Sequence, residues 1–404
     1  MRGSTMVPRM KIPRYLPYML GTLTAVGPIS TDLYLPAFHK IEAGFGLPHG
    51  AAQITLATWF FGFAVGQMLQ GAATDWLGRR TPLLAGTLIY SLASLGCALA
   101  PGMGALALGR FLSAIGGAAS SVVPRAVVRD HADGHAAARI MAQLALVTGV
   151  APLLAPAVGG FLLTFISWRW LFGFCVFYGL VSSALVYFFL PETLPPRKRH
   201  AIHVGAALQR YWGILREPHF ASHTFMSSAA LFAIFSFVSG SPVMVTAYHI
   251  STARMGVLLT CASIPYILSA QLNPRLLAVF GTDRVIGGAV VGTLVASSLA
   301  FVGARLWVLP LPVFIGMVMA NTMSLGLIMP NAMISALSRH ARSAGSASAL
   351  AGTVNFLAAA LCGWLSGIVA DGTVRPITGM LLGGSMVLVV AQMVRLRVRR
   401  VVAR

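Results

Sequence analysis

The stretch GAATDWLGRRTP, residues 71–82, is a short polar interval between two long apolar segments. Gly71 and Gly78 lie on either side of Asp75, and glycines permit a tight turn and a close approach of two helices. We expect Asp75 to lie where the next helix begins, because a carboxylate is stabilised at the positive end of a helix dipole. Two arginines follow the second glycine, so the pattern predicts a charged turn between two membrane-spanning helices.

The apolar segments that flank this turn recur along the whole chain. Of the 404 residues, 57% are hydrophobic and 9% are charged, whereas a soluble domain carries about 25% charged residues. The apolar blocks have the length that a helix needs to cross the hydrocarbon layer, and a helix satisfies its own backbone hydrogen bonds there. We therefore predict an all-α membrane protein with twelve spans, at about residues 15–37, 52–73, 81–100, 103–128, 140–164, 169–190, 221–240, 255–273, 284–304, 307–329, 345–369 and 376–394.

The positive charge is distributed unevenly between the loops. The chain has 29 Lys and Arg against nine Asp and Glu, for a formal net charge of +20. If the N-terminus is inside, the inner segments hold 23 of these 29 basic residues, and Arg110 lies within a span. This asymmetry follows the positive-inside rule, so it predicts two cytoplasmic termini and argues against a nucleic-acid partner. The outer segments hold the other five, Lys40, Arg169, Arg254, Arg305 and Arg375.

The longest polar stretch, residues 191–220, divides the predicted spans into six and six. A linker between two equal bundles indicates an internal duplication of the kind common in secondary transporters. NPRLLAVFGTDRV (273–285) is a weak match to the charged turn at the equivalent place in the second half. We predict a cytoplasmic N-terminus (1–14), an N-terminal six-helix bundle (15–190), the cytoplasmic linker (191–220), a C-terminal six-helix bundle (221–394) and a basic cytoplasmic tail (395–404).

Two charges, Asp32 and Arg110, fall inside predicted spans and away from the span ends. An ionisable group at membrane depth costs at least about 2.5–3.5 kcal/mol on insertion scales, so each is a candidate functional residue. The alternative is that Asp32 reaches water near the interface and that Arg110 snorkels. Burial disfavours the charged form of a carboxyl group, which suits a group that binds and releases a proton. Both lie roughly 8–10 Å from the outer ends of their spans at about 1.5 Å per residue, so a pair across a cavity is a prediction that the sequence leaves open.

The pattern G-x-x-x-D-x-x-G-R-R in residues 71–80 resembles the signature loop of the major facilitator superfamily. Four further elements resemble the Bcr/CflA-type drug:proton antiporters of that family. They are STDLYLPAF (30–38), GRFLSAIGGAASSVVPRAVVRD (109–130), TGVAPLLAPAVGGFL (148–162) and GSASALAGTVNFL (345–357). The resemblance covers nearly the whole chain, and it implies two six-helix bundles and export driven by protons.

The resemblance also implies roles for individual residues. It makes Asp32 the proton-coupling or cation-binding acid and Arg110 its charged partner, and both would contact substrate. It assigns one set of residues to a conformational latch, which would pair with the start of the eleventh span. It assigns a second set to a flexible, closely packed face of the fifth span. The latch residues are Gly71, Asp75, Gly78, Arg79 and Arg80, and the residues of the fifth span are Gly149, Pro152, Pro156, Gly159 and Gly160.

Three positions depart from the pattern of this group. Ser113 and Asn355 stand where the group usually has Gln, and Ala155 stands where a Gly usually precedes the proline of the fifth span. Ser113 and Asn355 belong to helices that line the substrate cavity in the family, so we include them in the predicted substrate-binding set. These departures affect the expected substrate more than the expected mechanism.

The sequence carries no sign of a nucleotide, metal or disulfide site. None of the three lysines, Lys11, Lys40 and Lys198, stands in a phosphate-binding loop, so we expect no cofactor and a proton gradient as the energy source. His131 and His135 have a metal-like spacing but fall in a solvated loop, and no metal site is predicted. The four cysteines are expected to be apolar packing residues; they are Cys97, Cys175, Cys261 and Cys362.

The leading hypothesis is a monomeric, proton-coupled exporter of small apolar or cationic drugs in a bacterial inner membrane, working by alternating access. Its partners would be the substrate, protons and the lipid bilayer. The alternative is a dedicated exporter of one metabolite or one antibiotic class, which a substrate panel would separate from the first. A membrane-embedded enzyme or sensor would need a cluster of catalytic groups in the spans, but away from their ends these hold one acid and one arginine, so no enzymatic activity is expected.

Overall fold

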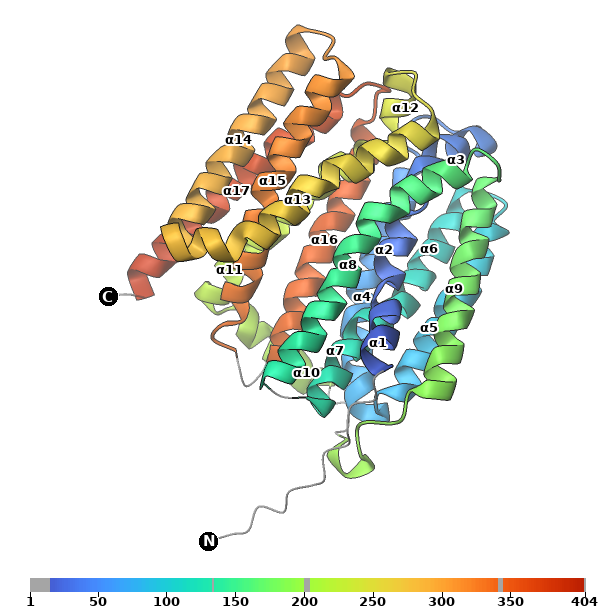
Figure 1. Cartoon of the computed structure of the whole chain (residues 1–404), viewed down its shortest axis with the longest axis vertical. Coiled ribbons are helices and arrows are strands. Elements are labelled where there is room, and N and C mark those ends of the chain that lie inside the picture. The colour runs from blue at the N-terminus through green and yellow to red at the C-terminus, as the bar shows by residue number, and fades with distance from the viewer. Residues whose placement is uncertain (1–14, 133, 200–203, 341–343, 403–404) are drawn as a thin grey trace.

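A computed structural model describes residues 15–132, 134–199, 204–340 and 344–402 (Figure 1). The predicted N-terminal segment 1–14 lies outside the described residues. The described residues form helices and connecting loops and include no strand. This confirms the all-α fold class.

The helices of the first half follow the predicted spans closely except at the first. That span is divided, because Pro28 and Pro36 lack the N–H group that continues a helix, and Asp32 is the last residue of its second piece. The elements are α1 (Leu16–Thr24), α2 (Val26–Asp32), η1 (Leu35–Ala37), α3 (Phe38–Phe45), α4 (Gln53–Leu77), α5 (Arg80–Ala98), α6 (Met103–Gly117), α7 (Ala119–His131), α8 (Gly134–Leu162) and α9 (Trp168–Phe189).

The second half begins after a linker that contains two short elements, η2 (Pro196–Lys198) and α10 (Val204–Leu215). The last helix runs on through most of the segment predicted as a basic tail. The elements are α11 (Pro218–Gly240), α12 (Val243–Ala247), α13 (Thr252–Phe280), α14 (Thr282–Leu306), α15 (Leu311–Leu337), α16 (Ala344–Val369) and α17 (Arg375–Val402).

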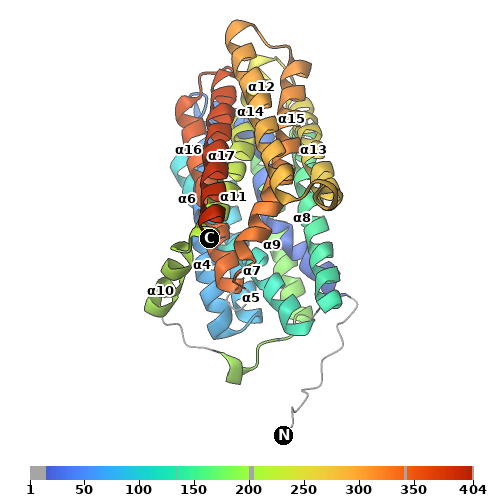
Figure 2. The same ribbon diagram turned by 90° about the vertical axis from the view of Figure 1, so that its left-hand side faces the viewer.

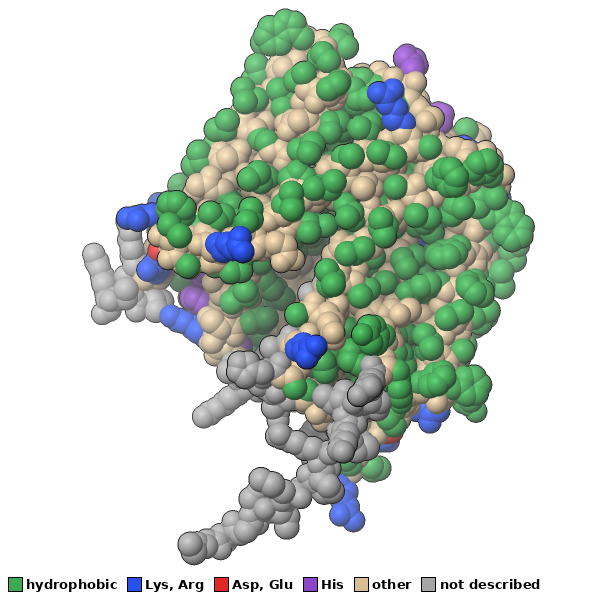
Figure 3. Space-filling model, in the orientation of Figure 1, with side chains coloured by type: hydrophobic (Ala, Val, Ile, Leu, Met, Phe, Trp, Pro, Cys, Tyr) green, Lys and Arg blue, Asp and Glu red, His purple; other side chains and the backbone are tan. Residues whose placement is uncertain are grey.

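Within the described residues, ten helices are long and apolar enough to cross a membrane. The other two predicted spans correspond to the divided segment 16–45 and to α4. Large apolar side chains cover the outer surface, as Figure 3 shows for one face. Phe165, Phe188 and Val308 are 74%, 73% and 94% exposed. A surface of this kind requires an apolar environment such as lipid.

The bundle has two ends that differ in their connections (Figures 1 and 2). We call the end with the α4–α5 turn, η2 and the α13–α14 turn the basic end, and the end with α3 and α12 the far end. The α4–α5 and α13–α14 turns each contain a glycine with positive φ, Gly78 at +92° and Gly281 at +76°. The weak sequence match between residues 71–82 and 273–285 therefore corresponds to a repeated turn.

The two halves meet along two seams, between α4 and α16 and between α8 and α13. The first seam is closely packed at its far end, where a Cβ added to Gly50 would lie 2.5 Å from the Gly367 oxygen. It is also closely packed midway, where a Cβ added to Gly352 would lie 2.3 Å from Gln67. The second is close near the far end, where a Cβ on Gly256 would lie 2.2 Å from the Pro156 oxygen. Toward the basic end, α8 and α13 diverge (Figure 1).

Candidate functional site

Asp32 is a buried acid at the end of α2, with 8% of its surface exposed. No Lys, Arg or His nitrogen of the described residues lies within 4.0 Å of its carboxylate. The next residue, Leu33, contacts α8, because a Cβ on Gly159 would lie 1.8 Å from the Leu33 oxygen. Asp32 therefore sits at a break in the helix path and beside the fifth predicted span.

Arg110 is the second buried charge, with 2% of its surface exposed. Its guanidinium carbon lies 4.2 Å from the ring centroid of Tyr34 and 4.3 Å from that of Trp59. Its Nε and Nη2 atoms have no hydrogen-bond partner among the described residues. Cation–π contacts therefore stabilise the charge, while two of its buried nitrogens have no acceptor among the described residues.

The structure does not join Asp32 and Arg110 in an ion pair, although both residues are described. Tyr34, two residues after Asp32, instead contacts the guanidinium. The similar depth of the two charges in the membrane does not establish an ion pair, because depth does not fix the direction in which each helix points its side chain. Tyr34 and Trp59 were missed by the sequence analysis, and their one signal was the aromatic character of the first two spans.

Ser113 and Asn355 lie on different helices and are both buried. The Ser113 hydroxyl donates to the Arg110 carbonyl at 2.9 Å, within its own helix. The Asn355 Oδ1 atom accepts from the hydroxyls of Ser227 and Ser228 at 2.9 and 2.7 Å. The amide oxygen is therefore held by α11.

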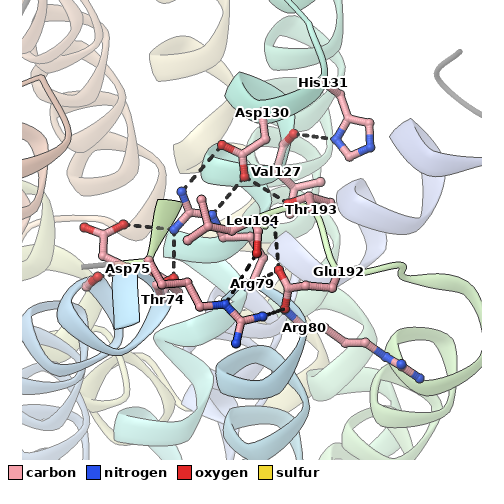
Figure 4. Close-up of polar contacts among 12 residues, drawn as sticks. Thr74, Asp75, Arg79, Arg80, Val127, Asp130, His131, Glu192, Thr193 and Leu194 are labelled. Carbon is pink, nitrogen blue, oxygen red and sulfur yellow. Dashed lines mark hydrogen bonds and ion pairs between the residues drawn. The ribbon is translucent and has the colours of Figure 1, made fainter. Parts of the chain in front are cut away.

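The charged turn forms a network at the basic end of the first half (Figure 4). Arg79 is its centre: Nε donates to Asp130 at 2.9 Å, and Nη1 donates to Asp75 and to the Thr74 carbonyl, each at 2.9 Å. The backbone N–H groups of Arg79 and Arg80 donate to Glu192 at 2.8 and 3.3 Å. The network therefore joins the ends of α4 and α7, the start of α5 and the segment after α9.

The carboxylates determine the charge state of this centre. Burial alone would lower the pKa of Arg79, but the hydrogen bonds and charges of Asp130 and Asp75 outweigh it and raise the pKa above its ordinary value. Arg79 is 7% exposed, so it is a buried cation with two anionic partners. Asp130 and Glu192 were not predicted as members, since 51 and 113 residues separate them from Arg79.

Two expectations about this turn are wrong. Asp75 lies in the last turn of α4 rather than at the start of the next helix, which begins at Arg80, and it is held by Arg79 rather than by a helix dipole. Gly71 lies inside α4 with nothing within 4 Å of an added Cβ, so it permits neither a turn nor a close contact. Gly78 fulfils the expectation of a tight turn, with a φ of +92°, but its close contact is with the Glu192 side chain after α9 and not with another helix.

The latch residues make no ion pair with α16 among the described residues. Arg129, near the end of α7, approaches the start of α16, since its Nη1 atom would lie 3.1 Å from a Cβ on Gly345. Residues 341–343, just before α16, lie outside the described part of the chain. The predicted pairing with the start of the eleventh span stays a prediction.

The predicted face of the fifth span lies on α8, with Pro152 and Pro156 inside the helix. Gly159 and Gly160 are closely packed, against Leu33 and against Thr252 of α13. The Thr260 hydroxyl of α13 also donates to the Leu153 carbonyl at 2.5 Å. Gly149 is different, because nothing lies within 4 Å of its added Cβ. Among the predicted glycines of this helix, close packing is therefore confined to Gly159 and Gly160, toward the far end.

A family model described as the Major Facilitator Superfamily matches residues 20–361. The chain belongs to this superfamily. It is 28% identical over 358 residues to a bicyclomycin resistance protein homologue of Haemophilus influenzae, and the aligned region covers 88% of this chain and 90% of the relative. It is 27% identical over 387 residues to the multidrug resistance protein MdtL of Klebsiella pneumoniae, with 92% and 93% covered. These names agree with the resemblance to drug-resistance exporters.

Solved structures share the fold at low identity. A bacterial homologue of the human lysosomal transporter Spinster, in an inward-facing and occupied conformation, has a TM-score of 0.72 at 17% identity, with 96% of each chain covered. A D-xylose–proton symporter has a TM-score of 0.67 at 15% identity, with 92% and 95% covered. The protein is therefore a multi-pass membrane transporter of the superfamily fold, and it is not an enzyme.

Proposed function

We propose that this transporter is a proton-coupled exporter of small apolar or cationic drugs. The observation that carries the proposal is Asp32, a carboxyl group buried at a helix break without a basic partner among the described residues. A buried carboxyl group without a cation beside it is stabilised by a proton or by a cationic ligand. Competition between the two for one site would couple outward substrate movement to inward proton movement.

The two seams support alternating access as the mechanism. The α8–α13 seam is closed at the far end and diverges toward the basic end. We propose that the basic end is cytoplasmic, as the positive-inside rule predicts, and that the protein acts as a monomer in a bacterial inner membrane. This arrangement would then be open toward the cytoplasm. Names of the bacterial relatives support drugs as the substrate class.

The test compares the wild type with Asp32→Asn in a bacterium that lacks other efflux pumps. Asparagine keeps the size of the side chain but cannot exchange a proton, so we expect resistance to fall to the level of cells without the transporter. Asp371→Asn is the matched control, because Asp371 is an exposed acid of a far-end loop and an amide oxygen can still accept from Thr373. Membrane levels of all three proteins are compared by immunoblot.

Each outcome decides a different part of the proposal. Resistance that only Asp32→Asn loses would support both export and the role of Asp32. Unchanged resistance in this variant would remove Asp32 from the coupling mechanism. Wild-type resistance to one compound class alone would indicate a dedicated exporter, and no resistance to any drug of the panel would contradict drug export.

A further inference from the structure

Three potential metal ligands converge at the far end of the first half. His39 and Glu42 are three residues apart on α3, so their side chains lie on one face of the helix. His49 follows in the loop between α3 and α4. A ligand atom of each residue lies within 4.8 Å of those of the other two.

Glu42 is fixed in a way that leaves one oxygen available. Its side chain is buried, and Oε1 accepts from the backbone N–H groups of Gly50 and Ala52 at 3.0 and 3.1 Å. These bonds hold the loop that carries His49 against α3. The other oxygen, Oε2, lies 3.7 Å from His49 Nδ1, and the rings of His39 and His49 stack with their centroids 6.1 Å apart. The loop hydrogen bonds therefore orient the carboxylate toward the histidines.

The three side chains line a small cavity of about 30 Å³, which is enough for an ion or a water molecule. Gln53 lines the same cavity. It is 4% exposed, and its Oε1 atom has no hydrogen-bond partner among the described residues. Leaving a buried carbonyl oxygen without a partner is unfavourable, so this oxygen independently indicates an occupant that offers a hydrogen-bond donor, such as metal-bound water.

We propose that His39, Glu42 and His49 bind a zinc-like transition-metal ion, with a water molecule as the fourth ligand facing Gln53. Two imidazoles and one carboxylate suit Zn²⁺ or Ni²⁺, whereas Mg²⁺ and Ca²⁺ prefer oxygen ligands. Ligand atoms of a tetrahedral zinc ion lie roughly 3.3–3.6 Å apart, so small side-chain rotations would close the site. His49 is exposed, which gives the ion a path from the surface.

The second half also lines this cavity, through the end of α16 at Ser366 and the neighbouring Ala370. Gly50, beside His49, packs against Gly367 of α16 in the closed far end. All three ligands belong to the first half, so the ion would bind without a ligand from the second half. It would fix the loop that forms the first half's side of this contact.

The test is calorimetric titration of the purified, tag-free full chain in detergent with ZnCl₂ and, separately, MgCl₂. We expect one Zn²⁺ per chain and no Mg²⁺ binding. His39→Ala, His49→Ala and Glu42→Gln should each weaken Zn²⁺ binding at least tenfold. Glu42→Gln keeps an oxygen for the loop N–H groups, so it separates metal binding from loop structure. His249→Ala is the matched control, because His249 is an exposed histidine of the far end outside the cluster, and it should bind Zn²⁺ like the wild type.

Thermal unfolding supplies a second readout that does not depend on transport. Zn²⁺ should raise the unfolding midpoint of the wild type and of His249→Ala but not of the three site variants, since a ligand stabilises the state that binds it. Equal Zn²⁺ affinity in wild type and site variants would place the ion elsewhere, and no binding to the wild type would overturn the proposal. If a histidine variant failed to fold, Glu42→Gln would decide the question. A folded Glu42→Gln protein that binds Zn²⁺ like the wild type would also contradict the proposal.

Discussion

Two buried arginines of this transporter have opposite surroundings. Arg79, at the basic end, donates to two carboxylates and a backbone carbonyl. Arg110, within the bundle, lies between the rings of Tyr34 and Trp59, and two of its nitrogens have no hydrogen-bond partner among the described residues. An arginine carries five N–H donors, and leaving buried donors unpaired is costly.

We propose that this difference separates a structural arginine from an arginine of the candidate site. The partners of Arg79 come from α4 and α7, and its own backbone N–H binds the segment after α9, so it stabilises the arrangement of helices in one half. The aromatic rings beside Arg110 stabilise its charge without using its donors. We infer that those donors serve a ligand with an acceptor group, and three sets of substitutions would test the division.

The largest expected effect is on transport in Arg110→Lys. Lysine keeps the positive charge but loses the planar guanidinium that stacks on the two rings and presents its donors in a fixed fork. We expect the initial rate of substrate efflux from loaded cells to fall at least tenfold, while the thermal unfolding midpoint of the purified protein changes by a few degrees at most.

Arg169→Lys provides the control for this substitution. Arg169 also stacks on an aromatic ring, with 4.2 Å from its guanidinium carbon to the Trp168 centroid, but it donates to the Ala100 carbonyl at 3.0 Å. One of its nitrogens is therefore paired within the protein, and transport should be retained. An equal loss of efflux in both variants would mean that stacking alone, rather than free donors, explains the effect.

The next effect concerns the stability of the network around Arg79. Double-mutant cycles with alanine should give a coupling of about 2 kcal/mol between Arg79 and Asp130, and less than about 1 kcal/mol between Arg79 and Asp75. The reason is exposure, since the side chain of Asp130 is 20% exposed and that of Asp75 is 68% exposed. Unfolding by SDS titration in mixed micelles measures both. Couplings of equal size would show that screening by solvent does not decide the strength of these pairs.

The sequence predicts the helices of this protein better than their contacts. Predicted spans such as 284–304 and 169–190 agree with α14 and α9 within a few residues, because apolar length is a strong local signal. The break of the first span was missed, because helices of membrane proteins often continue through a proline. Contacts with neighbouring helices determine whether a given proline interrupts the helix, and the sequence does not show these contacts.

The site was predicted in part, for a similar reason. Asp32 and Arg110 could be recognised as buried charges from composition alone, but their partners depend on helix rotation, which a sequence does not fix. Glu42 shows the same limit, because it falls between the predicted spans 15–37 and 52–73, whereas the structure buries it on α3 beside two histidines. The spacing of His39 and Glu42 on one helix face was the signal that could have found this cluster.

Three glycines near the two repeated turns separate backbone strain from steric contact, and their expected effects decrease to about zero. Gly78→Ala should lower the thermal unfolding midpoint most, by the equivalent of about 1–3 kcal/mol, because φ is +92° and the new Cβ would lie 2.2 Å from Glu192 Oε2. Gly281→Ala should cost less, since φ is +76° but nothing lies within 4 Å. Gly71→Ala should be neutral or slightly stabilising, because this position is helical and open and alanine favours a helix over glycine by about 1 kcal/mol. Equal decreases in the unfolding midpoint for Gly78→Ala and Gly281→Ala would show that backbone strain dominates. Displacing Glu192 from the Arg79 and Arg80 N–H groups would then have little effect on stability.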